Sequence, residues 1–438
     1  MLKKQTVSVV TFGCQMNEYD SSKIKGILKN HNFPIIEDYK KADVILINTC
    51  AVREKSEHKV FSLIGRLLLI KKKRNLVIGV GGCSAEVSKD YLLKHFPALD
   101  IIFTPENYPK IAQFVENALK GQRSIHEIIE DNEEVVVESM FEECGASACI
   151  SIMKGCDNNC AYCIVPQARG AEISRRPETI FKEIELALKS GVKEIILLGQ
   201  NVNSYQFKDI TFPQLLDEVA KIDGIKRLRF VTSHPKDVSD ELIHVIKQNR
   251  NICRNIHLPV QSGSDATLKR MNRGYTYGHY REIISKFKAA IPEITFSTDM
   301  IVGFPQETEE DFEKTFQAVK DINFEGIYLF KYSVRQGTDA EKMDDDVTPK
   351  EKQRRFDLIL NYQREMVLKK NKSLEGKIVN VLVTDFSKKD KHKLCGRTEN
   401  SKAVNFNSNG EVNINDVVDV RILAGFPNSL EGEIVKNN

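Results

Sequence analysis

Three cysteines in the middle of the chain, Cys156, Cys160 and Cys163, follow the spacing CxxxCxxC. Thiolates are the usual protein ligands of iron–sulfur clusters. Three thiolates on one short loop can hold three irons of a [4Fe–4S] cluster, which leaves the fourth iron open to a small molecule. An open coordination position is typical of catalytic metal sites. The spacing therefore predicts a cluster of this kind.

Two other interpretations of this loop stay open. The cysteines can be half of a zinc site, although such sites usually pair two CxxC knuckles and no second one lies nearby. They can also be a chance grouping in a buried loop. Tyr162 lies between the last two cysteines, where it can pack against a bound nucleoside or serve as a core aromatic residue.

A second set, Cys14, Cys50 and Cys83, is spread over the N-terminal part of the chain. Each cysteine comes just after the predicted end of a different strand. Ligands collect outside the carboxyl ends of the strands in open parallel sheets, so the three thiols are expected to meet in one crevice. Single cysteines at strand ends are also often small buried residues, and this alternative stays open.

The segments around these cysteines predict repeated βα units. Near the N-terminus, strands are expected at residues 7–11, 44–48 and 76–80, with helices from about residues 20, 54 and 86, which indicates a Rossmann-like parallel sheet. From residue 149 onward, strands are expected at 150–154, 194–198, 228–232, 255–258, 296–301 and 327–332. Six βα units are too few for the closed eight-unit form, so we expect a partial (β/α)6 barrel.

The C-terminal part of the chain changes to short alternating runs. After a long charged helix at 349–374, strands are expected at 378–384, 402–406, 417–423 and 430–435, which is typical of a small antiparallel, OB-like barrel. The overall fold class is α/β. The predicted domains are 1–122, an acidic connector at 123–143, a barrel domain at 144–374 and the small barrel at 375–438.

Composition indicates a globular protein. The 438 residues are 41% hydrophobic and 29% charged, and 64 basic residues nearly balance 61 acidic ones, so net charge does not identify a partner. The N-terminus lacks the pattern of a signal peptide and no apolar run is long enough for a membrane span, so we expect a cytoplasmic location without membrane contact. Ten cysteines in that compartment are more plausibly metal ligands or catalytic groups than disulfides.

Taken together, these motifs resemble the MiaB family of radical S-adenosylmethionine methylthiotransferases along nearly the whole chain. The resemblance is carried by segments 12–18 (FGCQMNE), 48–55 (NTCAVREK), 155–163 (GCDNNCAYC), 198–205 (LGQNVNSY), 257–264 (HLPVQSGS), 271–275 (MNRGY) and 299–305 (DMIVGFP). Three stretches differ from the usual pattern: 165–170 (VPQARG), 332–338 (YSVRQGT) and the residues that follow Gly81-Gly82-Cys83.

The resemblance implies two [4Fe–4S] clusters and S-adenosylmethionine as cofactors. Cys156, Cys160 and Cys163 would hold the radical-generating cluster, and Cys14, Cys50 and Cys83 an auxiliary cluster. The C-terminal barrel would be a TRAM domain, a module associated with RNA binding. The partners would be tRNA, through an anticodon stem-loop that carries isopentenyladenosine 37, and a flavodoxin or ferredoxin electron donor.

The implied reaction places a methylthio group on C2 of that adenine. One S-adenosylmethionine would methylate sulfur held at the auxiliary cluster, and a second would give a 5′-deoxyadenosyl radical that removes the C2 hydrogen. Two other possibilities remain within the class: action on threonylcarbamoyladenosine 37 or on a ribosomal protein side chain. A non-enzymatic iron–sulfur protein that binds RNA is a possibility from another class.

Four further residues are candidate cofactor contacts besides Tyr162. Gln200 follows a predicted strand where related enzymes place a polar residue near the amino group of S-adenosylmethionine, although it can also be a turn former. Gln261, Arg273 and Asp299 lie at strand ends or in the loops after them, where parallel barrels carry their working groups. Each of the three can equally be a structural or helix-capping residue.

The small barrel carries a local excess of basic residues between positions 384 and 406. Six basic residues face three acidic ones there, which gives +3 and predicts either contact with RNA phosphates or a solvated turn. The basic residues are Lys388, Lys389, Lys391, Lys393, Arg397 and Lys402.

Overall fold

The computed structural model describes residues 4–51, 54–125, 136–142, 144–387, 390–407, 410 and 412–435. The predicted acidic connector therefore lies partly outside the described residues. In the described part of the chain, no helix combines the length and the apolar character that crossing a bilayer requires.

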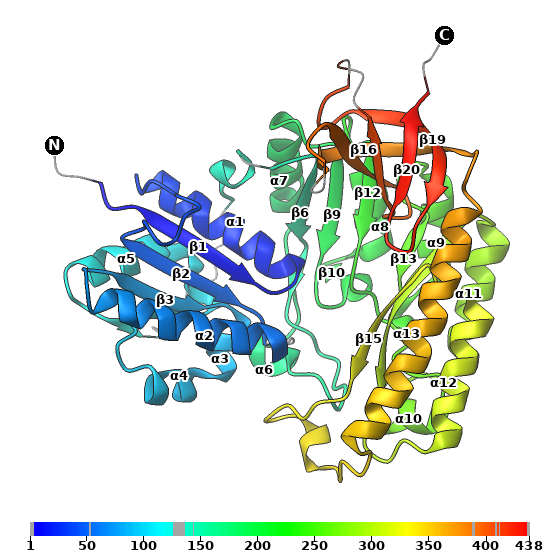
Figure 1. The fold of residues 1–438 in the computed structure, drawn as a ribbon, viewed down its shortest axis with the longest axis horizontal. Helices are drawn as coiled ribbons and strands as arrows, with labels where there is room; N and C mark the ends of the chain where they lie inside the picture. The colour runs from blue at the N-terminus through cyan, green and yellow to red at the C-terminus, as the bar shows by residue number, and fades with distance from the viewer. Residues whose placement is uncertain are drawn as a thin grey trace.

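The N-terminal part is a five-stranded sheet in which every pair of neighbours is parallel (Figure 1). The three predicted strands are confirmed, and two short strands extend the sheet beyond them. These two have only three and two residues, too few to show a hydrophobic period. In order, the strands are β1 (Val7–Phe12), β2 (Val44–Thr49), β3 (Val77–Gly81), β4 (Ile101–Phe103) and β5 (Ser124–Ile125).

Helices cover both faces of this sheet. On one face, α1 and α5 pack against the side chains of alternate strand positions, and on the other α2 and α4 pack against the positions between them. The helices of this part are α1 (Gln15–Asn30), α2 (Glu54–Lys71), α3 (Cys83–Val87), α4 (Lys89–His95), the 3-10 helix η1 (Pro105–Lys110) and α5 (Ile111–Leu119). The first helix begins at Gln15, earlier than the sequence pattern indicated.

The central part contains the six predicted parallel strands, which confirms the partial barrel. They form two three-stranded sheets, ordered β12-β9-β6 and β13-β14-β15. Their bounds are β6 (Ser147–Ser151), β9 (Glu194–Leu198), β12 (Arg227–Phe230), β13 (Asn255–His257), β14 (Thr295–Val302) and β15 (Gly326–Lys331). Two short antiparallel pairs accompany them: β7 (Met153–Lys154) with β8 (Ile173–Ser174), and β10 (Gln206–Phe207) with β11 (Ile210–Thr211).

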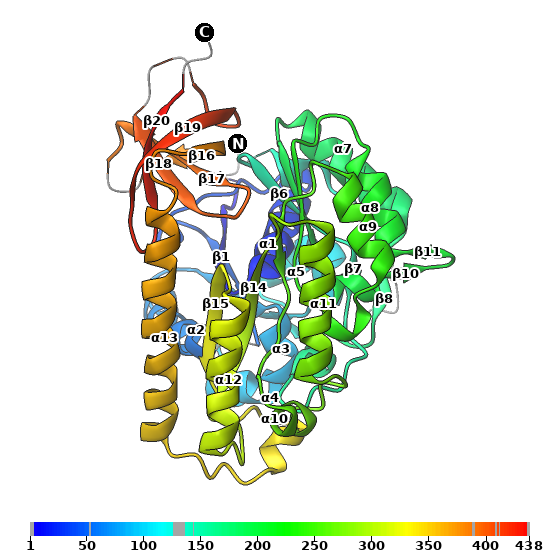
Figure 2. The same ribbon diagram turned by 90° about the vertical axis from the view of Figure 1, so that its right-hand side faces the viewer.

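Helices follow the barrel strands and line the outside of the sheets (Figure 2). They are α6 (Val165–Arg169), α7 (Pro177–Lys189), η3 (Val202–Ser204), α8 (Phe212–Ala220), η4 (Pro235–Asp237), α9 (Asp240–Gln248), α10 (Asp265–Arg270), α11 (Tyr277–Ala290), α12 (Glu309–Ile322), η5 (Asp339–Lys342) and α13 (Pro349–Lys372). Helix α13 begins at the residue expected from sequence, where Thr348 accepts a hydrogen bond from the amide of Glu351.

The C-terminal part is a closed barrel, which confirms the predicted small barrel, but it has five strands where four were expected, in the order β16-β17-β18-β20-β19. One pair, β18 with β20, is parallel, and the other pairs are antiparallel. The sequence did not reveal β17, because its residues belong to the lysine-rich segment that was interpreted as a turn. The strands are β16 (Ile378–Phe386), β17 (Lys393–Thr398), β18 (Ala403–Asn407), β19 (Val417–Gly425) and β20 (Leu430–Ile434).

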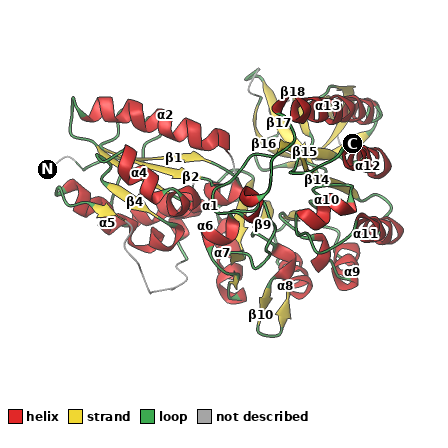
Figure 3. Ribbon diagram, turned by 90° about the horizontal axis from the view of Figure 1, so that it is seen from below, coloured by secondary structure: helices red, strands yellow, loops and turns green. Residues whose placement is uncertain are grey.

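Helix α1 joins the N-terminal sheet to the central barrel, and Figure 3 shows it between the two. Tyr19 of α1 and Ile150 of β6 belong to one continuous cluster of buried apolar side chains. The short 3-10 helix η2 (Glu138–Phe141) packs on α1 with Phe141 buried, so the expected exposed connector is wrong for this stretch. The two α/β parts therefore share a core.

Polar contacts attach the small barrel to the central one. The buried side chain of Arg227 donates hydrogen bonds to the carbonyl of Arg397 at 2.6 Å and to the carbonyl and side-chain oxygens of Asn380 at 2.9 and 2.8 Å. Arg229 donates to the carbonyl of Thr398 at 3.2 Å, and Lys402 forms an ion pair with Glu325. Helix α13 leads into the small barrel on the same side.

Replacing Arg227 with Ala should loosen the small barrel, because it removes the hydrogen bonds to Arg397 and Asn380, each worth about 0.5–1.5 kcal/mol. We expect faster tryptic cleavage after residue 372 and a lower melting temperature. The matched control is Arg421→Ala on the exposed side of β19, which should change neither. Equal cleavage rates for the two variants would contradict this account of the attachment.

Candidate functional site

The first cysteine set, Cys156, Cys160 and Cys163, comes together on the loop between β7 and α6. The amide of Cys163 donates to the carbonyl of Cys160 at 2.9 Å. Cys156 is near enough for its charge to raise the pKa of Cys163. The amide of Ala161 donates to the carbonyl of Met271 at 2.9 Å, which fixes the middle of the loop. The loop thus holds all three thiols at one end of the central barrel.

Polar side chains point at two of these thiols. The guanidinium of Arg273, only 5% exposed, donates to Cys160 Sγ at 3.2 Å and to the carbonyl of Pro259 at 3.2 Å. Asn158 donates to Cys156 Sγ at 3.4 Å. Of the predicted cofactor contacts, Arg273 is thus the one that touches a cysteine.

Burial makes two of the three thiols, those of Cys156 and Cys163, hard to ionise by themselves. It raises the pKa of Cys156, and it raises the pKa of Cys163 to about 12. Buried thiolates need compensating positive charge, and metal ions supply it. The donor set of three thiols therefore suits an iron–sulfur cluster that leaves one iron without a protein ligand.

The second set of cysteines also comes together, at the carboxyl ends of neighbouring strands. Cys14 follows β1, Cys50 follows β2 and Cys83 follows β3. A hydrogen bond between the side chains of Cys14 and Cys50 lowers the pKa of Cys14 to about 6, against the opposing effect of burial. Burial raises the pKa of Cys83, on which the charge of Cys14 also acts.

A buried amide pair braces this second site. The Asn17 side chain accepts from the Cys14 amide at 3.2 Å and donates to Asn48 Oδ1 at 3.3 Å, while Asn48 donates to the Asn17 carbonyl at 3.0 Å. Gly82 has φ +89°, and a Cβ there would lie 2.2 Å from Asn48 Oδ1. The three cysteine loops are therefore closely packed, and only glycine fits at position 82.

Sequence reasoning missed three residues of this second site. Arg169 donates to Cys83 Sγ at 2.9 Å and to Asp20 Oδ2 at 2.8 Å, and Tyr108 donates to the same carboxylate oxygen at 3.2 Å. Arg169 lies in the segment VPQARG, which follows the first cysteine set. This position directly after the cluster loop was the one signal in the sequence that could have indicated a role for Arg169.

Neither cysteine set resembles a mononuclear site. Among the described residues, no three His, Cys, Asp or Glu side chains are placed to hold a single metal ion. The thiolates of a [4Fe–4S] cluster bind different irons, so they lie farther apart than ligands of one zinc ion.

Two of the predicted cofactor contacts have unusual surroundings. The Oε1 atom of Gln200 is buried and has no hydrogen-bond partner among the described residues, and such an oxygen is available to an incoming donor such as an ammonium group. Gln261 has φ +67°, and its backbone pairs with Asp299 and Ile301. A left-handed glutamine is uncommon and needs a surrounding structure that holds it.

The other two lie in different environments. Asp299 faces the inside of the barrel, 3.4 Å from His257 Nε2 and in register with the exposed Tyr328. Tyr162 is half-buried and packs edge-on against Phe304, with ring centroids 6.4 Å apart. Its exposed part leaves both interpretations open, the contact with a nucleoside and the core aromatic residue.

The basic residues of the small barrel are less available than their sequence suggested. Lys402 is paired with Glu325 and donates to Asn371 at 2.7 Å, and Lys393 forms an ion pair with Glu431 at 2.5 Å. Lys388 and Lys389 lie outside the described residues. Much of the predicted local charge is therefore neutralised within the protein.

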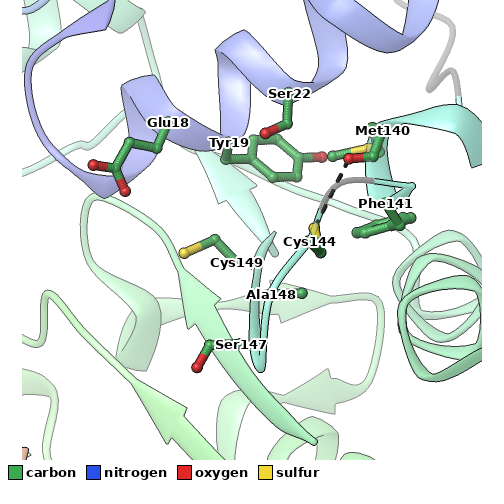
Figure 4. A pocket seen from close by; sticks show the side chains of 9 residues that line it. All are labelled: Glu18, Tyr19, Ser22, Met140, Phe141, Cys144, Ser147, Ala148 and Cys149. Carbon is green, nitrogen blue, oxygen red and sulfur yellow. Dashed lines mark hydrogen bonds between the residues drawn. The ribbon is translucent and has the colours of Figure 1, made fainter. Parts of the chain in front are cut away.

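A separate cavity of about 140 Å³ lies between α1 and β6 (Figure 4). Cys144 and Cys149 line it, and their sulfur atoms point in different directions. No predicted site residue is among its lining residues, which are Glu18, Tyr19, Ser22, Met140, Phe141, Cys144, Ser147, Ala148 and Cys149.

Two of the three stretches that depart from the family pattern contact each other. Gln167 donates a hydrogen bond to the carbonyl of Gly337, whose φ is +86°. A Cβ at residue 337 would lie 2.5 Å from Gln167 Oε1. These departures therefore form a local pair, and the same segment 165–170 also carries Arg169, which donates to Cys83 Sγ, and Gly170, whose carbonyl accepts from the Cys156 amide at 3.2 Å.

Three family models match successive parts of the chain. Residues 6–104 match the uncharacterised protein family UPF0004, residues 150–319 the radical SAM superfamily, and residues 372–435 the TRAM domain. The fold resembles solved structures of the radical SAM methyltransferase TsrM from Kitasatospora setae (TM-score 0.54, 13% identity, 74% of this chain and 73% of that one). It also resembles the cobalamin-dependent enzyme OxsB (TM-score 0.53, 14% identity, 84% and 56%).

Fold and cysteine loop together define a radical SAM enzyme, a class that uses S-adenosylmethionine and a [4Fe–4S] cluster. The chain is 45% identical to the tRNA-2-methylthio-N(6)-dimethylallyladenosine synthase of Thermodesulfovibrio yellowstonii (99% of this chain, 100% of the relative) and 43% identical to that of Clostridium perfringens (99% and 99%). It belongs to this family of methylthiotransferases.

Two glycines beside the first cysteine set provide a matched test of its packing. Gly155 and Gly170 both have φ +75°, but a Cβ on Gly155 would lie 1.9 Å from the Ala171 carbonyl oxygen, whereas nothing lies within 4 Å of one on Gly170. Gly155→Ala should displace Cys156 and reduce bound iron from about eight to about four atoms per chain, since one of two [4Fe–4S] clusters is lost.

Gly170→Ala should keep the iron, because it adds only the left-handed backbone strain of about 1–2 kcal/mol. Iron analysis after anaerobic reconstitution measures both variants. Equal iron contents in the two proteins would show that close packing at Gly155 does not support the cluster.

Proposed function

We propose that the chain replaces the C2 hydrogen of N6-isopentenyladenosine 37 in tRNA with a methylthio group. The proposal is carried by one observation: two separate cysteine sets, one on a radical SAM loop and one at the edge of a parallel sheet, lie in neighbouring domains that share a core. The names of the full-length relatives and the match to the TRAM domain support this substrate.

We propose the six cysteines as the ligands of two clusters. Cys156, Cys160 and Cys163 would hold the radical-generating cluster, and Cys14, Cys50 and Cys83 the auxiliary one. When bound, these groups supply radical formation from S-adenosylmethionine and a methylated sulfur for transfer. The chain itself holds the thiols in place through Arg273 at Cys160 and Arg169 at Cys83.

The residues around the barrel opening would orient the cofactor and substrate. Gln200 presents its unpartnered buried oxygen for the amino group of S-adenosylmethionine, and Arg273 keeps the cluster loop against the barrel. Gln261 and Asp299 are joined by a backbone hydrogen bond, and both would line the cofactor region. Tyr162 would pack in the small apolar cluster next to that region.

The partners follow from the proposed reaction. The anticodon stem-loop of tRNA would contact the small barrel and the inner face of the central barrel, where Tyr328 and Phe330 are exposed. Aromatic side chains of this kind stack on unpaired bases. A reduced flavodoxin or ferredoxin would supply electrons, and a tRNA substrate would place the enzyme in the cytoplasm.

Alanine substitutions should separate the two cysteine sets. Cys160→Ala should abolish cleavage of S-adenosylmethionine, because the radical-generating cluster loses one of its three thiolates. Cys50→Ala should retain cleavage but stop methylthiolation. The measurements are 5′-deoxyadenosine and product formation with isopentenylated tRNA, and Cys395→Ala in the small barrel serves as the control. Retained cleavage in Cys160→Ala would overturn the assignment of that cluster.

Nucleoside mass spectrometry should identify the substrate in cells that lack the gene. Restoring the wild-type chain should return the methylthio group to isopentenyladenosine, whereas the Cys50→Ala chain should not. If isopentenyladenosine stays unmodified and the mass appears on threonylcarbamoyladenosine or a ribosomal protein, the substrate proposal is wrong although the radical class stands.

A further inference from the structure

Arg169 extends from the radical SAM domain into the site of the second cysteine set. Helix α6 begins two residues after Cys163 and ends at Arg169, where it packs on α3, the helix that starts with Cys83. The guanidinium donates to Cys83 Sγ through Nε at 2.9 Å and to Asp20 through Nη2 at 2.8 Å. One short helix therefore connects a residue of each cysteine set.

This contact is buried, and the guanidinium in it stays charged. The side chains of Arg169 and Asp20 are 8% and 6% exposed, and the hydroxyl of Tyr108 donates to the same carboxylate at 3.2 Å. Burial opposes the charge on Arg169, but Asp20 and Cys83 outweigh it and raise the pKa of the guanidinium. A permanent positive charge thus lies in hydrogen-bond contact with Cys83.

Such a charge acts on the electron affinity of a cluster. Reduction adds negative charge to the cluster and its thiolates, so hydrogen bonds to sulfur and nearby positive groups favour the reduced form. The effect is larger in a buried site, where the effective dielectric constant is low. A neighbouring carboxylate acts in the opposite direction.

We propose that Arg169 is a positioning residue that fixes Cys83 and raises the reduction potential of the auxiliary cluster, while Asp20 limits that rise. The inference rests on the proposed function, in which Cys14, Cys50 and Cys83 hold this cluster. Arg273 has the corresponding place at the other set, where it donates to Cys160. Each cluster is thus given its own buried guanidinium.

The test uses the full-length chain with Cys156, Cys160 and Cys163 changed to Ala, so that only the auxiliary cluster remains. After anaerobic reconstitution with iron and sulfide, its midpoint potential is measured by a redox titration followed by electron paramagnetic resonance. Arg169→Gln should lower the potential, because it removes the charge. Asp20→Asn should raise it, because it leaves the charge of Arg169 unbalanced in an isosteric site.

Two further variants separate charge from packing. Arg169→Lys keeps the positive charge and should retain most of the wild-type potential. Arg74→Gln removes an arginine from the same domain, where its guanidinium donates to the carbonyl of the exposed Lys40 at 2.9 Å, and should leave the potential unchanged. A purely structural role for Arg169 would shift the potentials of Arg169→Gln and Asp20→Asn in the same direction.

Shifts of the same sign, or unchanged potentials in both variants, would overturn the inference. If Arg169→Gln binds no iron, Asp20→Asn decides alone: a raised potential supports the proposal and an unchanged or lowered one overturns it. Cys14→Ala in the same background tests the underlying assignment separately. Retention of all iron there would contradict the proposed ligands, whatever the result for Arg169.

Discussion

The buried ion pair between Arg169 and Asp20 is the contact on which the relative placement of the two cysteine sets depends. Asp20 lies on α1, which packs against both the N-terminal sheet and the central barrel, and Arg169 ends the helix that leaves the first cysteine loop. Removing one partner of such a pair costs about 3–5 kcal/mol, because the other charge is left buried. The pair therefore defines one geometry for the two sites.

The parallel sheet next to this contact brings the three cysteines of the second set together. Cys14, Cys50 and Cys83 are separated by more than thirty residues from one another, yet β1, β2 and β3 end at the same edge. Asn17 and Asn48 then join the loops through buried side-chain hydrogen bonds. A site made from distant segments thus becomes rigid through hydrogen bonds between its loops as well as within them, as between Asn17 and the Cys14 amide.

The sequence predicted those features of the fold and the site whose residues lie close together in the chain. The alternating or apolar runs of the six barrel strands and the spacing of Cys156, Cys160 and Cys163 could be interpreted directly. Strand β17 could not, because it directly follows a lysine-rich stretch that indicates a turn, and β5 has only two residues. Arg169 and Asp20 lie 149 positions apart, and no pattern in either segment indicates their contact. Such pairs are determined by tertiary packing, which periodicity does not report.

The two kinds of domain boundary in this molecule have different consequences for how its parts can be exchanged. The N-terminal and central parts are joined by a continuous apolar core that includes Tyr19 and Ile150. Separating them would expose that core to water, so neither half is expected to be transferable without the other. The small barrel is held by hydrogen bonds and ion pairs around Arg227 and Lys402 and has its own core. It is consequently the one part of the chain that recombination can replace without rebuilding the catalytic centre.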